Sequence, residues 1–138
     1  MLQRIQSIWL LLASACAFIS LKVPFYSGTK TGETLTSKLM GTENFYLMLL
    51  TIAVGVIALI TIFLYSNRKL QMRLCILNII MEALLIFLYY RETQNYIAGT
   101  GTYALTSILQ VLVIVFIILA MRGISYNNKI IRDSNRLR

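Results

Sequence analysis

The run FYLMLLTIAVGVIALITIFLY, residues 45–65, decides the fold of this chain. It holds 21 residues and no charged side chain. At a rise of 1.5 Å per residue a helix over this run is about 31 Å long, which matches the roughly 30 Å of hydrocarbon in a bilayer. The run is too long for an ordinary strand, and a single strand in lipid would leave its backbone groups without partners, whereas a helix pairs them internally. The sequence therefore predicts a transmembrane helix over these residues.

Three further apolar runs have lengths that also suit a membrane. They lie at residues 5–21, 74–90 and 103–121 and contain 17, 17 and 19 residues. Snorkelling side chains such as Lys22 can extend the shorter runs to the headgroups. The last run contains the β-branched stretch VLVIVFII, but its length favours a helix over a strand. We therefore expect an all-α fold, a four-transmembrane-helix antiparallel bundle that forms a single domain over residues 1–138.

The composition agrees with a membrane protein. Hydrophobic residues make up 58% of the 138-residue chain and charged residues 13%, whereas soluble domains average roughly 45–50% and about 25%. The chain has no histidine, and its two cysteines, Cys16 and Cys75, lie inside apolar runs. We expect both cysteines to pack as small hydrophobic side chains. No metal site and no cofactor is expected, because histidine is the commonest metal ligand and two thiols do not complete a zinc site.

The 13 Lys and Arg residues are distributed unevenly along the chain. If the amino terminus is cytoplasmic, nine of them lie on the cytoplasmic side and four on the other, as the positive-inside rule requires. The nine are Arg4, Arg68, Lys69, Arg73, Arg122, Lys129, Arg132, Arg136 and Arg138, and the four are Lys22, Lys30, Lys38 and Arg91. We therefore predict a multi-pass protein of the bacterial inner membrane with both termini in the cytoplasm.

The connections and the ends of the apolar runs carry residues that mark the membrane surfaces. Tyrosines at these positions are typical of the aromatic belts of membrane proteins. The expected belt residues are Tyr26, Tyr46, Tyr89, Tyr90 and Tyr103 at the outer surface and Tyr65 at the inner surface. The connection over residues 22–44 is rich in Thr, Ser and Gly, which predicts an exposed loop or a small hairpin.

The stretch LLASACAF, residues 11–18, has features of a signal peptidase or lipoprotein cleavage site. Ala13-Ser14-Ala15 is a small-x-small triplet, and Cys16 follows it directly. The apolar core of a signal peptide spans about 7–15 residues and ends at the cleavage site, whereas here the apolar run continues through AFISL. A lipoprotein would carry a polar tether after its cysteine. We therefore expect a retained first helix whose small residues let neighbouring helices approach closely.

Glu82 lies at the centre of the run at 74–90, eight residues from each end. An ionised carboxylate is costly inside a bilayer, so such a residue is expected to face other helices rather than lipid. Asn78 lies one turn away on the same helical face, and Gln110 lies at a similar depth in the following run. No Lys or Arg lies deep enough to neutralise Glu82, so we expect a protonated acid that is hydrogen-bonded to Asn78 or Gln110.

Two interpretations of this intramembrane polar site are open. Glu82 is either the titrating group of a proton- or cation-coupled site, or part of a neutral polar clamp that fixes helix packing at about 1 kcal/mol per hydrogen bond. A proton path usually contains several ionisable residues, and this site offers one acid and two amides, so the clamp is favoured. The chain shows neither a nucleophile–base pair nor a glycine-rich phosphate loop after a strand, so no enzymatic activity is expected.

The tail RGISYNNKIIRDSNRLR, residues 122–138, carries five basic residues and one acid. Its charge predicts an interfacial helix or a disordered arm that binds anionic lipid. Nucleic acid is not an expected partner, because Tyr126 is the one aromatic residue among these charges and base stacking needs more.

The two ends of the chain resemble those of a known family. MLQRIQSIWLLLA at the amino terminus and DSNRLR at the carboxyl terminus are similar to an uncharacterised family of small integral membrane proteins, a domain of unknown function found mainly in Bacteroidetes. The resemblance rests on residues 2–6 and 136–138, and the middle of the chain matches in hydropathy. It implies a four-helix inner-membrane protein and supplies no catalytic or ligand residues. It also implies that the two ends contact each other or a partner.

Small multidrug transporters are a second comparison, since they also have four helices and one membrane-embedded glutamate and act as dimers. In that group the glutamate lies in the first helix and the charge bias is weak, whereas here Glu82 lies in the third run and the bias is strong. We therefore expect a non-enzymatic accessory or assembly subunit of a membrane complex, which binds other membrane proteins or a second copy of itself. A small oligomeric proton-coupled transporter that uses Glu82 is the alternative.

Overall fold

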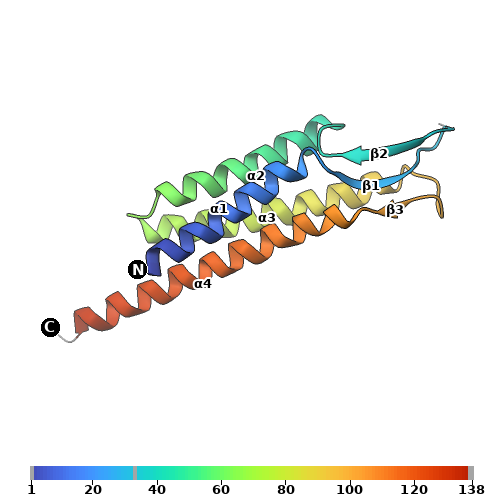
Figure 1. Cartoon of the computed structure of the whole chain (residues 1–138). Helices are drawn as coiled ribbons and strands as arrows, with labels where there is room; N and C mark the ends of the chain where they lie inside the picture. The colour runs from blue at the N-terminus through green and yellow to red at the C-terminus, as the bar shows by residue number, and fades with distance from the viewer. Residues whose placement is uncertain (1, 33, 137–138) are drawn as a thin grey trace.

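The computed structural model describes residues 2–32 and 34–136, which form four long helices and a small sheet. The helices are α1 (Leu2–Ser20), α2 (Phe45–Phe63), α3 (Arg68–Thr93) and α4 (Ile108–Arg136). They lie side by side, and the chain reverses direction after each one, so that α1 begins beside the α2–α3 turn and α4 extends past this turn (Figure 1). We call this the terminal end of the molecule, and the end that carries the strands the sheet end.

Each helix packs mainly on two others. α1 contacts α2 and α4, and α3 contacts the same two helices from the other side. A hydroxyl strengthens the α1–α2 contact, because Ser14 Oγ donates a hydrogen bond of 3.0 Å to the carbonyl oxygen of Gly55. The ring of Phe18 lies against Gly55 so closely that a Cβ there would approach it to 2.9 Å. Gly55 therefore allows the close approach of α1 and α2.

The chain is mostly helical with four helices, as expected, but it is not strictly all-α, because it also forms a three-stranded antiparallel sheet. Its strands are β1 (Pro24–Thr29), β2 (Thr36–Met40) and β3 (Thr102–Tyr103), in the order β2-β1-β3. β1 and β2 are the hairpin expected within residues 22–44, in which Ser27 pairs with Lys38. β3 comes from the α3–α4 connection and pairs Thr102 with Ser27. A strand of two residues has no alternation that a sequence pattern could reveal.

The helices extend beyond the apolar runs on the terminal side. α3 begins at Arg68 rather than near residue 74, and α4 continues from the membrane-compatible part to Arg136, so the tail that was expected to be a separate segment is the end of one 29-residue helix. Hydropathy marks the part of a helix that suits lipid, whereas Lys, Arg and Gln are good helix formers that continue it into water.

Within residues 2–32 and 34–136, three helices are long and apolar enough to cross a membrane, as judged by length and composition. They are α2, α3 and the part of α4 over Ile108–Asp133, whereas the apolar part of α1, Ile5–Ser20, is shorter.

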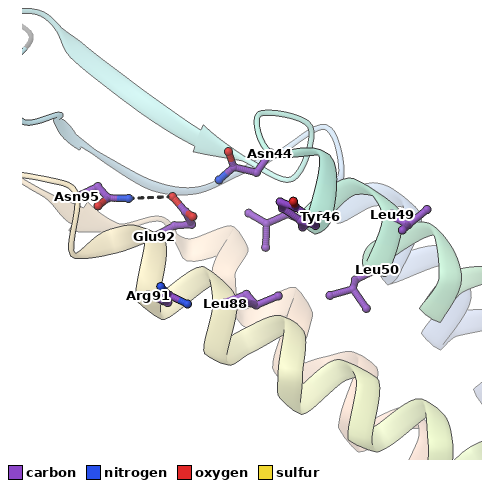
Figure 2. Close-up of a pocket in the computed structure, with 9 residues that line it drawn as sticks. Asn44, Tyr46, Leu49, Leu50, Leu88, Arg91, Glu92 and Asn95 are labelled. Carbon is purple, nitrogen blue, oxygen red and sulfur yellow. Dashed lines mark hydrogen bonds between the residues drawn. The ribbon is translucent and has the colours of Figure 1, made fainter.

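At the sheet end, the first turns of α2 and the last turns of α3 line a pocket with polar and apolar walls (Figure 2).

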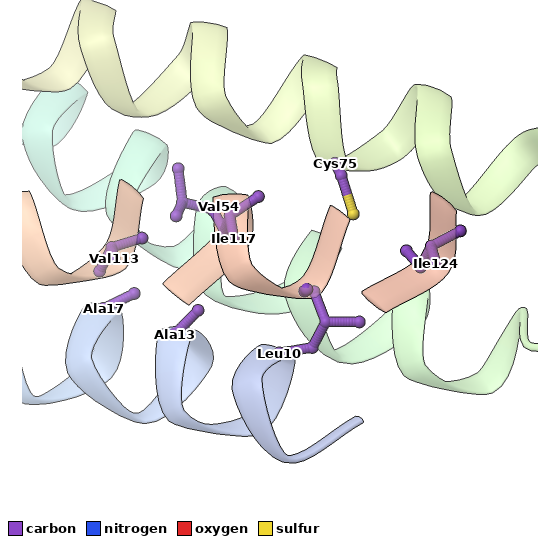
Figure 3. Close-up of a cluster of buried hydrophobic side chains, with 9 residues drawn as sticks. Leu10, Ala13, Ala17, Val54, Cys75, Val113, Ile117 and Ile124 are labelled. Carbon is purple, nitrogen blue, oxygen red and sulfur yellow. The ribbon is translucent and has the colours of Figure 1, made fainter. Parts of the chain in front are cut away.

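One group of buried apolar side chains fills the space between all four helices (Figure 3). Small residues of α1 face larger ones of α4 in this group, which brings the two helices close together. Its members are Leu10, Ala13, Ala17, Val54, Cys75, Val113, Ile117, Ala120 and Ile124. Both cysteines are free thiols, and Cys75 is buried as expected.

A second group of buried side chains joins the helices to the sheet. Tyr89, which was expected to lie in an aromatic belt, is fully buried there and stacks on Phe25 of β1 with ring centroids 4.4 Å apart. Its position on the inner face of α3 explains the difference, since Tyr90 on the next position is exposed. The sheet is therefore fixed on the helices through aromatic contacts.

The packing of α1 on α4 gives a test of the fold. Ala17→Leu should destabilise the protein by about 1–3 kcal/mol, because it inserts a larger side chain at a filled site where the alanine is 1% exposed. Ala83→Leu at an exposed position of α3 is the matched control and should have little effect. Thermal unfolding in mild detergent measures both, and equal midpoints for the two variants would contradict the packing described.

Candidate functional site

The inner face of α3 is the most polar buried surface of the protein. Its buried residues recur every three or four positions, which places them on one side of the helix. They are Gln71, Cys75, Asn78, Glu82, Leu85, Tyr89 and Thr93. The opposite face carries large exposed apolar side chains, among them Ile76, Ile80 and Phe87. α3 is therefore polar inside and apolar outside.

The three residues of the expected polar site are all buried. Glu82 is 0% exposed, Asn78 1% and Gln110 2%. Among the described residues, Glu82 is the one buried member of the Asp, Glu, Lys and Arg group. The carboxyl group therefore has no buried countercharge within the described part of the chain, which agrees with the expectation of a neutral acid.

The expected hydrogen bonds from Glu82 to Asn78 or Gln110 are not made in the structure. Asn78 instead donates its amide nitrogen to the carbonyl oxygen of Val54 on α2, at 3.3 Å. Neither carboxyl oxygen of Glu82 has a hydrogen-bond partner among the described residues. Asn78 thus acts as a link between α3 and α2, which the sequence spacing alone did not reveal.

Gln71 repeats the arrangement of Asn78 two turns earlier in α3. Its amide nitrogen donates a hydrogen bond of 3.1 Å to the carbonyl oxygen of Thr61, also on α2. Gln71 is not among the site residues predicted from the sequence, because it lies outside the apolar run at 74–90. Its spacing of seven residues from Asn78 is the signal that could have placed it on the same face.

Both amide side chains use their nitrogen for α2, so their oxygens remain free to accept hydrogen bonds. Buried side-chain oxygens without a hydrogen-bond partner in the described chain include Gln6 Oε1, Gln71 Oε1, Asn78 Oδ1, Glu82 Oε1 and Oε2, Tyr89 Oη and Gln110 Oε1. Native proteins satisfy almost all buried polar atoms, with water where protein groups are lacking. The interior therefore holds several polar oxygen atoms whose expected partner is water.

The buried oxygens restrict the kinds of ligand that the interior could bind. Oxygen-only groups suit protons, water and hard cations rather than transition metals. The described residues contain no group of three or more His, Cys, Asp and Glu that could hold a metal ion. Of these oxygens, those of Glu82 belong to the one carboxyl group, which can exist as a neutral acid or as a carboxylate.

The end of α4 forms a second polar surface, which we call the basic arm and define as residues 122–133. Three basic residues lie in it, Arg122, Lys129 and Arg132, and one acid, Asp133. Arg68 at the start of α3 donates to the carbonyl oxygen of Asn127 at 3.4 Å, which ties the arm to the neighbouring helix.

Contact between the two termini is only partly visible. Gln6 of α1 lies against Gly123 of α4, where a Cβ would approach the Cβ of Gln6 to 3.3 Å. The side chains of residues 2–4 and 134–138, on which the expected terminal contact depends, lie outside the described residues.

Substitutions at Glu82 give a test of its buried position. Glu82→Gln keeps the size and neutrality of a protonated acid and should change stability by less than about 1 kcal/mol. Glu82→Lys should cost about 2.5–3.5 kcal/mol, because it places a charge at the centre of a helix in lipid. Thermal unfolding after reconstitution measures both, with Asp133→Lys at an exposed position near the end of α4 as the matched control. A Glu82→Lys variant as stable as that control would show that water reaches this position.

The chain belongs to the family described as domain of unknown function DUF4293, since the family model matches residues 2–137. The resemblance of the two ends to an uncharacterised family is thus confirmed over nearly the whole chain. A search of curated proteins and a search of solved structures gave no match.

Proposed function

We propose that this DUF4293 protein spans the bacterial inner membrane four times, with both termini in the cytoplasm. Support for a fourth span comes from α1, whose Ala13 and Ala17 are buried against the other helices while Ile8 and Leu11 are exposed. Lys22 at the end of α1 can extend its apolar part to the headgroups. The terminal end carries most of the basic residues, which favours a cytoplasmic position for it.

The proposed role is that of a non-enzymatic accessory or assembly subunit of a membrane complex. One observation carries this proposal: the basic arm extends α4 past the ends of the other helices (Figure 1). Its apolar side chains are exposed, Tyr126 at 57%, Ile130 at 43% and Ile131 at 45%. A helix with both basic and exposed apolar side chains is suited to an anionic lipid surface or to a partner protein.

The interior also fits a binding role better than an enzymatic one. An enzyme must admit its substrate to the reacting groups, and the most chemically active side chain, Glu82, is fully buried. The partners of this proposal are the bilayer itself, anionic lipid at the basic arm, and other membrane proteins or a second copy of the chain. Nucleic acid and cofactors are not part of it.

Topology is tested with reporter fusions. A reporter that is active only in the cytoplasm should give a signal when it is fused at residue 1 or at residue 138. A reporter that is active only outside the cytoplasm should give a signal when it is inserted at the exposed turn residue Gly32. Signals from residues 1 and 138 on opposite sides of the membrane would contradict the four-span arrangement.

The accessory role is tested by removing charge from the basic arm. The double substitution Lys129→Gln and Arg132→Gln should lower the amount of partner protein that co-purifies in mild detergent, because it removes two of the arm's three described cations. The matched control removes two cations from the sheet end, Lys30→Gln and Lys38→Gln, and should leave co-purification unchanged. Equal recovery with both double variants, or purification without a stoichiometric partner, would argue against the role.

A small oligomeric proton-coupled transporter is the second candidate function. The observation that favours it is the buried carboxyl group of Glu82, which has no hydrogen-bond partner in the described part of the chain and shares a helix face with the amide oxygens of Gln71 and Asn78. Proton pathways in membrane proteins are built from such intramembrane polar residues.

Flux measurements in proteoliposomes decide this candidate. An imposed proton gradient should acidify vesicles that contain the wild-type chain faster than vesicles with Glu82→Gln, since the amide cannot carry the proton. Acidification at the same rate in both preparations, with Glu82→Gln shown to be folded, would exclude coupling through this residue.

A further inference from the structure

The pocket at the sheet end has an arrangement that neither proposed function uses. It encloses about 470 Å³ between the first turns of α2 and the last turns of α3, a size typical of small-molecule sites. It opens outward, because Tyr46 is 74% exposed and Leu49 55%. Since α2 and α3 both have the length and composition to cross a membrane, their ends place this pocket at the level where hydrocarbon meets headgroups.

The walls of the pocket change from apolar to polar along the helices. Leu49, Leu50 and Leu88 lie on the side toward the middle of the helices, and Asn44, Glu92 and Asn95 lie beside the strands (Figure 2). A water-soluble ligand would gain little from the leucine wall, whereas a lipid presents its acyl chain and its headgroup in the same order. The gradient of polarity therefore favours a lipid.

Donors for a phosphate group are available at the polar side. Arg91 is exposed and lines the pocket, and its guanidinium offers the paired N–H groups that suit phosphate oxygens. The first turn of α2 adds to this, because Asn44, directly before the helix, makes no side-chain capping hydrogen bond. The free backbone N–H groups of that turn remain available for an anion beside Arg91.

A carboxylate also lines the pocket. Glu92 follows Arg91 in the chain and is half-buried in the pocket wall, where its Oε2 accepts a hydrogen bond of 3.0 Å from Asn95 Nδ2. A fixed negative charge repels a headgroup with net negative charge and attracts an ammonium group that donates hydrogen bonds. The pocket thus offers one cation and one anion to a headgroup that carries both charges.

We propose that this pocket binds one phospholipid with a primary-amine headgroup, whose phosphate contacts Arg91, whose ammonium group contacts Glu92 and whose acyl chain lies on Leu49, Leu50 and Leu88. The proposal is independent of the accessory and transport roles, because it requires only that α2 and α3 cross the membrane. It assigns the sheet end a lipid site, separate from the basic arm at the terminal end.

Native mass spectrometry of the delipidated full chain tests this site. Three phospholipids with identical acyl chains are added in equal amounts: phosphatidylethanolamine, phosphatidylcholine, which lacks ammonium N–H groups, and phosphatidylglycerol, which lacks the ammonium group. The wild-type chain should retain phosphatidylethanolamine about two- to fivefold more than the others, the range expected for ion pairs near a surface. Glycerophosphoethanolamine, which has no acyl chains, should not bind detectably.

Variants separate the two charges. Arg91→Gln should lower retention of all three phospholipids, whereas Glu92→Gln should remove the preference for phosphatidylethanolamine and leave phosphatidylglycerol binding intact or increased. Arg73→Gln, an exposed arginine near the other end of α3, is the matched control, and thermal unfolding checks that all variants fold. Equal retention of the three lipids by the wild-type chain, or the same retention by Arg91→Gln and Arg73→Gln, would overturn the proposal.

Leu50→Trp supplies a test that does not change charge. The larger side chain fills the apolar part of the pocket and should lower retention of every phospholipid, including phosphatidylethanolamine. Unchanged retention would show that the lipid binds elsewhere.

Discussion

The structure depends on the burial of polar side chains between helices whose outer faces are apolar. In water this arrangement would be unstable, because the carboxyl group of Glu82 and the amides of Gln71 and Asn78 would lose hydration while Ile76, Ile80 and Phe87 stay exposed. In lipid the preference is reversed: apolar side chains face hydrocarbon at no cost, and polar ones gain by pairing with other helices. The links from Gln71 and Asn78 to carbonyl oxygens of α2 are the form that this pairing takes.

The same constraint explains the difference between the two ends of the molecule. At the sheet end, aromatic stacking of Phe25 on Tyr89 joins the strands to the helices. The short sheet pairs the backbone N–H and C=O groups of the segments that connect the helices. At the terminal end, helices α3 and α4 continue as charged segments, and Arg68 connects them through the carbonyl oxygen of Asn127. The sheet end is therefore closed by a small sheet packed on the helices, and the terminal end is an extended basic surface.

The sequence predicted the four helices well, because an uncharged run such as residues 45–65 has one stable solution in a bilayer. It also placed Glu82, Asn78 and Gln110 at positions that the structure buries. It did not predict β3, whose two residues are held by pairing with β1 rather than by local preference. It also missed the bond from Asn78 to Val54, because spacing along one helix shows which residues share a face but not which carbonyl of a neighbour lies opposite. Tyr89 and Tyr90 show the same limit: adjacent tyrosines near a helix end look alike, and only packing separates the buried one from the exposed one.

The length of α4 has a mechanical consequence. Its 29 residues form one uninterrupted helix, which at a rise of 1.5 Å per residue is about 43 Å long, more than the hydrocarbon thickness of a bilayer. The short turn η1 (Leu105–Ser107) directly precedes it and leads back to β3. A helix is stiff along its axis, so α4 rigidly connects the terminal end of the molecule to the sheet end. A partner that binds the basic arm and displaces it would therefore move the other end of α4, which is connected to the sheet.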